Sequence, residues 1–181
     1  MTKEIKLLAI CGSLRKASTN LQLMHEGIRL FGAADVTQAN LRLPLYDGDL
    51  EAEGMPAEVT LLAQQIADAD AVLVVTPEYN KNLSGVLKNA LDWVSRIKDN
   101  PWLDKPVAIM SAAAGRAGGE RSQFSARHCL SPFQPRLITG PEVFIAASGD
   151  AFDADGRLIN ERSVRGVTNL MAVLRREAER G

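Results

Sequence analysis

The sequence Gly12-Ser13-Leu14-Arg15-Lys16-Ala17-Ser18-Thr19-Asn20 is a polar loop between two regular segments. Residues 5–11 before it form a short apolar run typical of a buried strand, and residues 21–30 after it repeat apolar side chains at helical spacing. A strand, a polar loop and a helix in this order direct backbone N–H groups and the positive end of the helix dipole into the loop. The sequence therefore predicts an anion site, and phosphate is the anion that suits it.

Short polar side chains and one arginine equip this loop for a phosphate. Arg15 adds a fixed positive charge suited to phosphate recognition. The hydrogen-bonding side chains of the loop are Ser13, Ser18, Thr19 and Asn20. A plainer alternative is that Ser18 or Thr19 only caps the helix and that Arg15 is solvated on a surface turn. The loop is neither Gly-x-Gly-x-x-Gly nor Gly-x-x-x-x-Gly-Lys-Ser/Thr, which disfavours a Rossmann dinucleotide site and a P-loop nucleotidase.

The composition indicates one globular α/β domain over residues 1–181. The chain has 181 residues, of which 46% are hydrophobic, enough for a substantial core. The net charge is −1, so we expect no nucleic-acid partner and no membrane partner. The two cysteines, Cys11 and Cys129, form neither a disulfide framework nor a metal-ligand cluster, and they suit a reducing cytoplasm. We expect no signal peptide, and no apolar run reaches membrane-spanning length.

Strand-like and helix-like segments alternate along the rest of the chain. Further strands are expected at residues 34–39, 71–76, 106–111 and 143–146. Helices are expected at residues 21–30, 56–67, 84–97, 120–130 and 162–179, and residues 43–49 are expected to form a surface loop. This alternation predicts an α/β, flavodoxin-like three-layer sandwich, with a five-stranded parallel sheet of order 2-1-3-4-5.

In this topology the loops after the first, third and fourth strands meet at one edge of the sheet. The second of these loops, Thr76-Pro77-Glu78-Tyr79-Asn80, places a rigid proline, an aromatic ring and an amide at a strand end. The third, residues 111–119, carries little side-chain bulk, so a flat ring can lie against its backbone N–H groups. Taken singly, each is equally well an ordinary turn or helix start. Together, a terminal phosphate site and a flat slot predict a mononucleotide with a large planar ring, and FMN fits best.

Three segments resemble the NADPH-dependent FMN reductase family, which includes bacterial quinone, chromate and azo-dye reductases. They are residues 12–20, 77–80 and 84–93, within a resemblance that runs from about residue 7 to residue 121. The resemblance implies a flavodoxin-like fold, bound FMN, a homodimer or homotetramer, and hydride uptake from NADPH or NADH.

The resemblance also implies which residues bind the cofactor. The FMN phosphate would be bound by Ser13, Arg15, Ser18 and Asn20, with Thr19 and Leu21 beside them. The ribityl chain and the ring would be lined by Pro77, Glu78, Tyr79 and Asn80. The far side of the ring would contact Ser111, Gly115, Gly118 and Gly119. The third loop departs from the family pattern, because Ala112-Ala113-Ala114 lacks the hydroxyl groups expected there.

The expected activity is that of an NAD(P)H-dependent FMN and quinone reductase. The flavin carries the redox chemistry, so we expect no side chain to act as a catalytic acid or nucleophile. In a ping-pong cycle, NAD(P)H would reduce the flavin at N5 and leave, and a quinone, chromate or an azo dye would then accept the electrons. No arginine is assigned to a 2′-phosphate, which leaves the choice between NADPH and NADH open.

Three alternatives to this activity stay open. The protein could be an NAD(P)H-dependent reductase that releases reduced FMN. It could be a non-enzymatic flavodoxin-type electron carrier, although such carriers are usually strongly acidic. It could also be a non-redox nucleotide-processing enzyme, which would need poised carboxylates, and Glu78 alone is thin support for that.

The helix expected at residues 84–97 has a wide apolar face. One apolar stripe consists of Leu83, Leu87, Leu91 and Val94. A second stripe consists of Val86, Ala90, Trp93 and Ile97. A helix that lies on a sheet needs only one such stripe, so the second predicts contact with a two-fold partner. The alternative is that neighbouring parts of the same chain, including Trp102, cover it.

Overall fold

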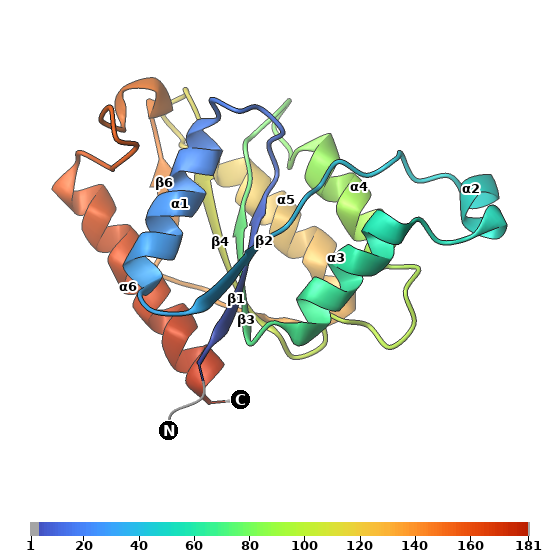
Figure 1. Ribbon diagram of the computed structural model, residues 1–181. Coiled ribbons are helices and arrows are strands. Elements are labelled where there is room, and N and C mark those ends of the chain that lie inside the picture. The colour runs from blue at the N-terminus through green and yellow to red at the C-terminus, as the bar shows by residue number, and fades with distance from the viewer. Residues whose placement is uncertain (1–3, 181) are drawn as a thin grey trace.

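The computed structural model describes residues 4–180 and consists of a parallel sheet with helices on both faces (Figure 1). The strands are β1 (Lys6–Cys11), β2 (Asp35–Gln38), β3 (Ala71–Val75), β4 (Pro106–Ala112), β5 (Arg136–Leu137) and β6 (Val143–Ile145). The helices are α1 (Thr19–Phe31), α2 (Gly48–Glu53), α3 (Ala57–Asp68), α4 (Gly85–Val94), α5 (Glu120–Leu130) and α6 (Glu161–Glu179). Short 3-10 helices lie at Ser131–Phe133 and Ser148–Asp150. Every strand and helix expected from the sequence is present, with ends that differ by a few residues.

The strand order β2-β1-β3-β4-β5 confirms the predicted topology, and the paired strands are parallel. The fifth position of the sheet is divided between two short strands. β5 pairs with the start of β4, and β6 pairs with its end. Pro141 lies between them and has no N–H to donate to a neighbouring strand. The strand expected at residues 143–146 is therefore only the second half of this position.

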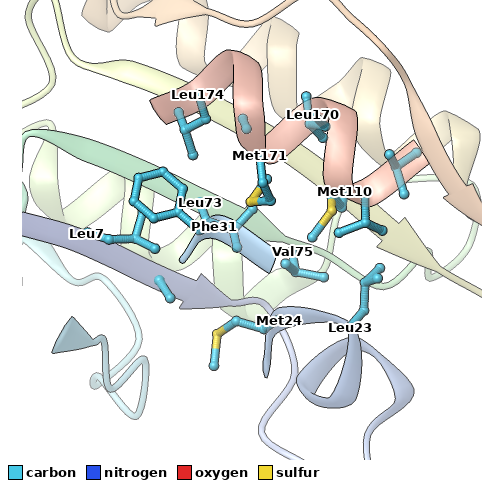
Figure 2. Close-up of a cluster of buried hydrophobic side chains, with 14 of the residues drawn as sticks. Leu7, Leu23, Met24, Phe31, Leu73, Val75, Met110, Leu170, Met171 and Leu174 are labelled. Carbon is cyan, nitrogen blue, oxygen red and sulfur yellow. The ribbon is translucent and has the colours of Figure 1, made fainter. Parts of the chain in front are cut away.

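Burial of the sheet on both faces explains the continuous apolar runs of its central strands. Successive strand residues point to opposite faces. On one face, α1 and α6 cover Leu7, Leu73 and Met110 (Figure 2). On the other face, α3, α4 and α5 cover Leu8 and Val74. Two hydrophobic cores thus hold the central strands in place. The strands in turn fix the positions at which the loops at their ends begin.

One helix was not predicted from the sequence. α2 begins within the segment that was expected to be a loop, residues 43–49. The carboxylate of Asp47 caps it by accepting the N–H of Asp49 at 2.9 Å, and Gly54 ends it. Both capping residues were visible in the sequence as helix boundary signals. No residue of α2 is buried, and the helix extends away from the body of the protein (Figure 1).

Candidate functional site

The loops that follow β1, β3 and β4 lie together at the carboxyl edge of the sheet, at the top of Figure 1. β1 lies between β2 and β3 in the sheet. The chain passes from β1 to β2 on one side and then crosses to β3 on the other side, so the strand order reverses at β1. Ligands of open α/β sheets bind at such a point. The hydrogen bonds between these loops show how the sequence builds a site here.

The first loop runs from Gly12 to the N-terminus of α1. The N–H of Gly12 donates to the carbonyl of Val75 at 2.8 Å, and a Cβ on Gly12 would come within 2.9 Å of Ser84 Oγ. Ser18 caps α1, because its hydroxyl accepts the N–H of Asn20 at 3.2 Å. Ser18 therefore caps the helix, as the plainer interpretation of the sequence proposed for it. Arg15 is exposed and has no carboxylate partner within residues 4–180, so its guanidinium is available to an anion.

Asn20 holds the start of α1 against the end of β4. Its Nδ2 donates to the carbonyl of Ala112 at 2.8 Å, and its Oδ1 accepts the N–H of Ala112 at 2.9 Å. The side chain is buried, so both bonds are shielded from water. A direct contact between this amide and a phosphate would require these bonds to break. The geometry therefore gives the Asn20 side chain a positioning role, while the neighbouring Leu21 packs against the core.

The second loop is a tight hairpin that displays Tyr79. Tyr79 and Asn82 exchange backbone hydrogen bonds of 3.1 and 3.0 Å. Between them, Asn80 and Lys81 have φ values of 50° and 65°, as a type I′ turn requires. Pro77, which precedes the hairpin, is buried, whereas Tyr79 is 52% exposed. A rigid turn thus presents an aromatic ring at the carboxyl edge.

The third loop depends on two glycines. Gly118 and Gly119 have φ values of 61° and 89°, and a Cβ on Gly118 would lie 2.7 Å from the backbone carbon of Phe144. The fully buried Ser111 supports the loop from beneath, because its hydroxyl donates to the carbonyl of Gly118 at 2.7 Å. Its side chain is therefore not placed to contact a ligand. Gly115 differs from the other two glycines, since a Cβ there would meet nothing within 4 Å.

Glu78 joins the second loop to the third. Its Oε2 accepts the backbone N–H of Arg121 at 3.1 Å, and its Oε1 lies 3.6 Å from the guanidinium of the same arginine. The cap residue of α5 is Gly119, which has no side chain to offer. Glu78 thus supplies the carboxylate that this helix N-terminus favours. It fixes the position of one loop relative to the other.

A fourth loop, residues 146–150, which the sequence patterns did not predict as part of the site, lies against the first and third loops. Ser148 is buried, and its hydroxyl accepts that of Thr19 at 3.1 Å. The N–H of Ser148 donates to the carbonyl of Ala113 at 3.1 Å, so this loop contacts both the first and the third. Ala147 has a φ of 44°, an uncommon value for a residue other than glycine. Its position in the sequence could have indicated this role, because the loop follows the last expected strand and so lies at the same edge of the sheet.

The residues near the first loop include no activated nucleophile. Burial raises the pKa of the Cys11 thiol, an effect that a hydrogen bond from the Ser13 backbone only partly offsets. The thiol is therefore protonated at neutral pH and unreactive. Within residues 4–180, no group of three or more His, Cys, Asp or Glu side chains could hold a metal ion. In the same part of the chain, no helix is both long and apolar enough to cross a membrane.

The fold defines a flavodoxin-like α/β protein, and these loops form a candidate mononucleotide site at the carboxyl edge of its sheet. A model of the family described as NADPH-dependent FMN reductase matches residues 5–150, and the chain belongs to this family. The matched region ends with the fourth loop and so contains all four loops of the site. The residues present fit FMN, since Arg15 and Tyr79 are exposed and the third loop is open at Gly115.

Individual relatives are similar over most of this chain. An NAD(P)H-dependent FMN reductase of Pseudomonas aeruginosa is 42% identical over 165 residues, which cover 90% of this chain and 89% of the relative. A quinone reductase of Escherichia coli K12 is 38% identical over 146 residues, or 78% of each chain. The solved structure of FerB, a flavoenzyme NAD(P)H:(acceptor) oxidoreductase from Paracoccus denitrificans, has a TM-score of 0.88 at 30% identity and covers 97% of this chain and 98% of its own. The chain is an oxidoreductase that uses FMN and NAD(P)H.

Proposed function

We propose that this protein reduces quinones to hydroquinones with electrons from NAD(P)H. The observation that carries the proposal is the set of four loops hydrogen-bonded to one another around the exposed Arg15 and Tyr79. The relative named as a quinone reductase supports this class of acceptor. In the overall reaction, NAD(P)H and one proton convert a quinone to a hydroquinone and NAD(P)⁺. Bound FMN would supply the two-electron chemistry of both half-reactions.

The first loop binds the phosphate end of the cofactor in this proposal. The Arg15 guanidinium offers a charge-assisted hydrogen bond, and Ser13 and the N-terminus of α1 add further donors. Asn20 and Ser18 hold these donors in place. Replacing Arg15 with alanine is expected to weaken FMN binding by about tenfold, since one charged hydrogen bond is lost. Fluorescence titration of the apoprotein with FMN measures this, and an unchanged affinity would remove Arg15 from the site.

The second and third loops hold the ring. The Tyr79–Asn82 hairpin and the open backbone at Gly115 bound a flat slot, with Glu78 fixing their separation. Backbone N–H groups of the third loop are the donors available to stabilise negative charge that develops on the ring during reduction. Chromate and azo dyes are further acceptors that we propose, because the family resemblance implies them.

A second copy of the chain is the partner that we propose, in a homodimer or homotetramer built on α4. Part of the second apolar stripe is covered within the chain, because Trp93 Nε1 donates to the carbonyl of Pro44 at 2.8 Å and Tyr46 packs on the indole. A cavity of about 520 Å³ remains between α4 and α5, with Leu91 and Phe133 in its lining. Sedimentation velocity tests this assembly, and a monomer at micromolar concentration would contradict it. We also propose a cytoplasmic location, since both cysteines are free thiols.

The visible absorption spectrum of the purified protein tests the proposed function. Flavin absorption that bleaches on anaerobic addition of NADPH and returns on addition of benzoquinone is the expected result. Flavin that binds and resists both NADPH and NADH would favour an electron carrier. Flavin that is reduced and then leaves the protein on gel filtration would favour a reductase that releases reduced FMN. A protein that takes up no FMN would overturn the proposal.

A further inference from the structure

A groove that has no role in the function proposed above begins at the fourth loop and runs between β6 and α6. One cavity of about 510 Å³ includes Ala146, Ala147 and Asp150 of that loop in its lining, together with Ile159. A second cavity of about 510 Å³ includes Arg162, Arg165 and Asn169 of α6. The lining residues common to both are Phe144, Ile145 and Ser163. The two cavities therefore adjoin one another along these residues, and together we call them the β6–α6 groove.

One end of the groove is positively charged. Arg162 and Arg165 lie three residues apart, so they share a face of α6. Both are exposed, and neither has a carboxylate partner in the part of the chain that the structure describes. Glu142 also lines this cavity, so the three charged side chains of the lining leave one positive charge in excess. Two unpaired guanidinium groups on one face suit a phosphate monoester dianion.

The charge does not come from the helix N-terminus alone. Asn160 caps α6, and its Oδ1 accepts the N–H groups of Arg162 and Ser163 at 3.0 and 3.1 Å. These two amides are therefore already engaged. Binding of a phosphate would depend on the two guanidinium groups and on the hydroxyl of Ser163, which lines both cavities.

The other end of the groove presents mainly apolar side chains, with the carboxylate of Asp150 among them, and adjoins the candidate site. Ala146, Ala147 and Ile159 contribute carbon surface, and Ile159 is 60% exposed. The same loop carries Ser148, which is hydrogen-bonded to Thr19 of the phosphate site. β6 is the direct neighbour of β4, and adjacent strands are about 4.8 Å apart. A ligand that extends from the ring site past the fourth loop therefore enters the apolar end first and reaches the arginines beyond it.

We propose that the β6–α6 groove binds the adenosine end of NADPH, with Arg162 and Arg165 on its 2′-phosphate. This inference rests on the proposed function, because the nicotinamide must lie at the ring site on the carboxyl edge. The adenine lies against Ile159 and the two alanines, and the 2′-phosphate lies between the guanidinium groups. Only NADPH carries that phosphate, so these residues make the enzyme prefer NADPH to NADH.

The test compares the two nucleotides on the FMN-loaded protein and on the double variant R162A/R165A. Calorimetric titration with NADP⁺ is expected to show binding weakened by at least about tenfold, because two charged hydrogen bonds are lost. Binding of NAD⁺ is expected to stay within about twofold of the unsubstituted protein, since NAD⁺ has no 2′-phosphate. In steady state, KM for NADPH rises by a similar factor, whereas kcat and KM for NADH do not change.

Two further variants distinguish this role from a general effect of charge. R176A removes another exposed arginine of α6 that is not among the groove residues, and it is expected to leave both affinities unchanged. R162K/R165K keeps both charges and is expected to restore most of the NADP⁺ affinity. Equal losses for NADP⁺ and NAD⁺, or unchanged NADP⁺ binding in R162A/R165A, would overturn the inference.

The failure of the proposed function gives a different result. If neither NADPH nor NADH reduces the bound flavin, the reductase assignment fails. The groove is then tested with adenosine 2′,5′-bisphosphate, which contains the adenosine and the 2′-phosphate and needs no flavin. Binding of this compound that is lost in R162A/R165A supports the groove independently of the redox reaction, and its absence in the unsubstituted protein overturns it.

Discussion

Two asparagines make the same pair of hydrogen bonds in two regions of this protein. Asn20 binds the N–H and the carbonyl of Ala112 at 2.9 and 2.8 Å, beneath the candidate site. Asn89 of α4 binds the N–H of Tyr46 and the carbonyl of Pro44, both at 2.8 Å, and so holds the arm (residues 43–54). The first pair is buried, whereas the second is open to solvent. The same kinds of hydrogen bond therefore have different consequences, because water can replace only the second pair.

The largest effect is expected from Asn20→Ala. The substitution leaves a buried N–H and a buried carbonyl of Ala112 without partners, at a cost of about 3 kcal/mol in the free energy of unfolding. The start of α1 would also move relative to β4, so FMN binding would weaken together with stability. Urea unfolding and FMN titration measure the two effects. A stable variant with normal FMN affinity would show that this link is not what positions the phosphate loop.

The next largest effect is expected from Gly118→Ala in the third loop. The new Cβ would lie 2.7 Å from the Phe144 backbone, and alanine disfavours a φ of 61°. Strain and crowding together are expected to cost about 2 kcal/mol. Gly115→Ala is the matched control, because its Cβ meets nothing within 4 Å and the fold is not disturbed. Equal thermal stabilities of the two variants would contradict the requirement for glycine at residue 118.

The same contrast between burial and exposure holds for two carboxylates. The Glu26 side chain is 1% exposed and pairs with Arg29 at 2.8 Å and Arg157 at 3.5 Å, whereas Glu51 of the arm is 23% exposed and pairs with Arg96 at 3.0 Å. The hydrogen bonds from Arg29 lower the pKa of Glu26, although burial opposes them. Its ionised form is thus favoured in the folded protein. This group stabilises the fold above its unfolded pKa, and the effect is lost as the pH falls through the folded value.

Glu26→Gln tests this pH dependence. At pH 7 the free energy of unfolding of the variant is expected to be about 1–2 kcal/mol lower than that of the original protein. The difference should shrink as the pH falls below about 4.3, the usual pKa of a glutamate in an unfolded chain. Urea unfolding at a series of pH values measures the difference. A gap that stays constant down to pH 3 would mean that the carboxylate charge is not what stabilises this region.

The sequence predicted what local patterns determine. The buried strands were recognisable as apolar runs. The loop from Gly12 to Asn20 was predicted to bind phosphate from its position and its polar side chains, and this role stays a prediction. Roles that depend on distant partners were not predicted. Glu78 looked like a ring contact because nothing in the sequence shows that it caps α5, and Asn20 looked like a phosphate ligand because Ala112 lies 92 residues away. Ser148 was missed for the same reason.

The smallest effect is expected from Asn89→Ala, which removes the two bonds between Asn89 and the arm. The N–H of Tyr46 would then be free to bond to water, and the carbonyl of Pro44 would keep its bond from Trp93 Nε1. We therefore expect a loss below about 1 kcal/mol in the free energy of unfolding. Hydrogen exchange of the Tyr46 amide should nevertheless speed up, because its acceptor is gone. Asn20→Ala measured in parallel completes the comparison. If both variants lose the same stability, then burial does not decide what these two asparagines contribute, and the arm belongs to the rigid part of the protein.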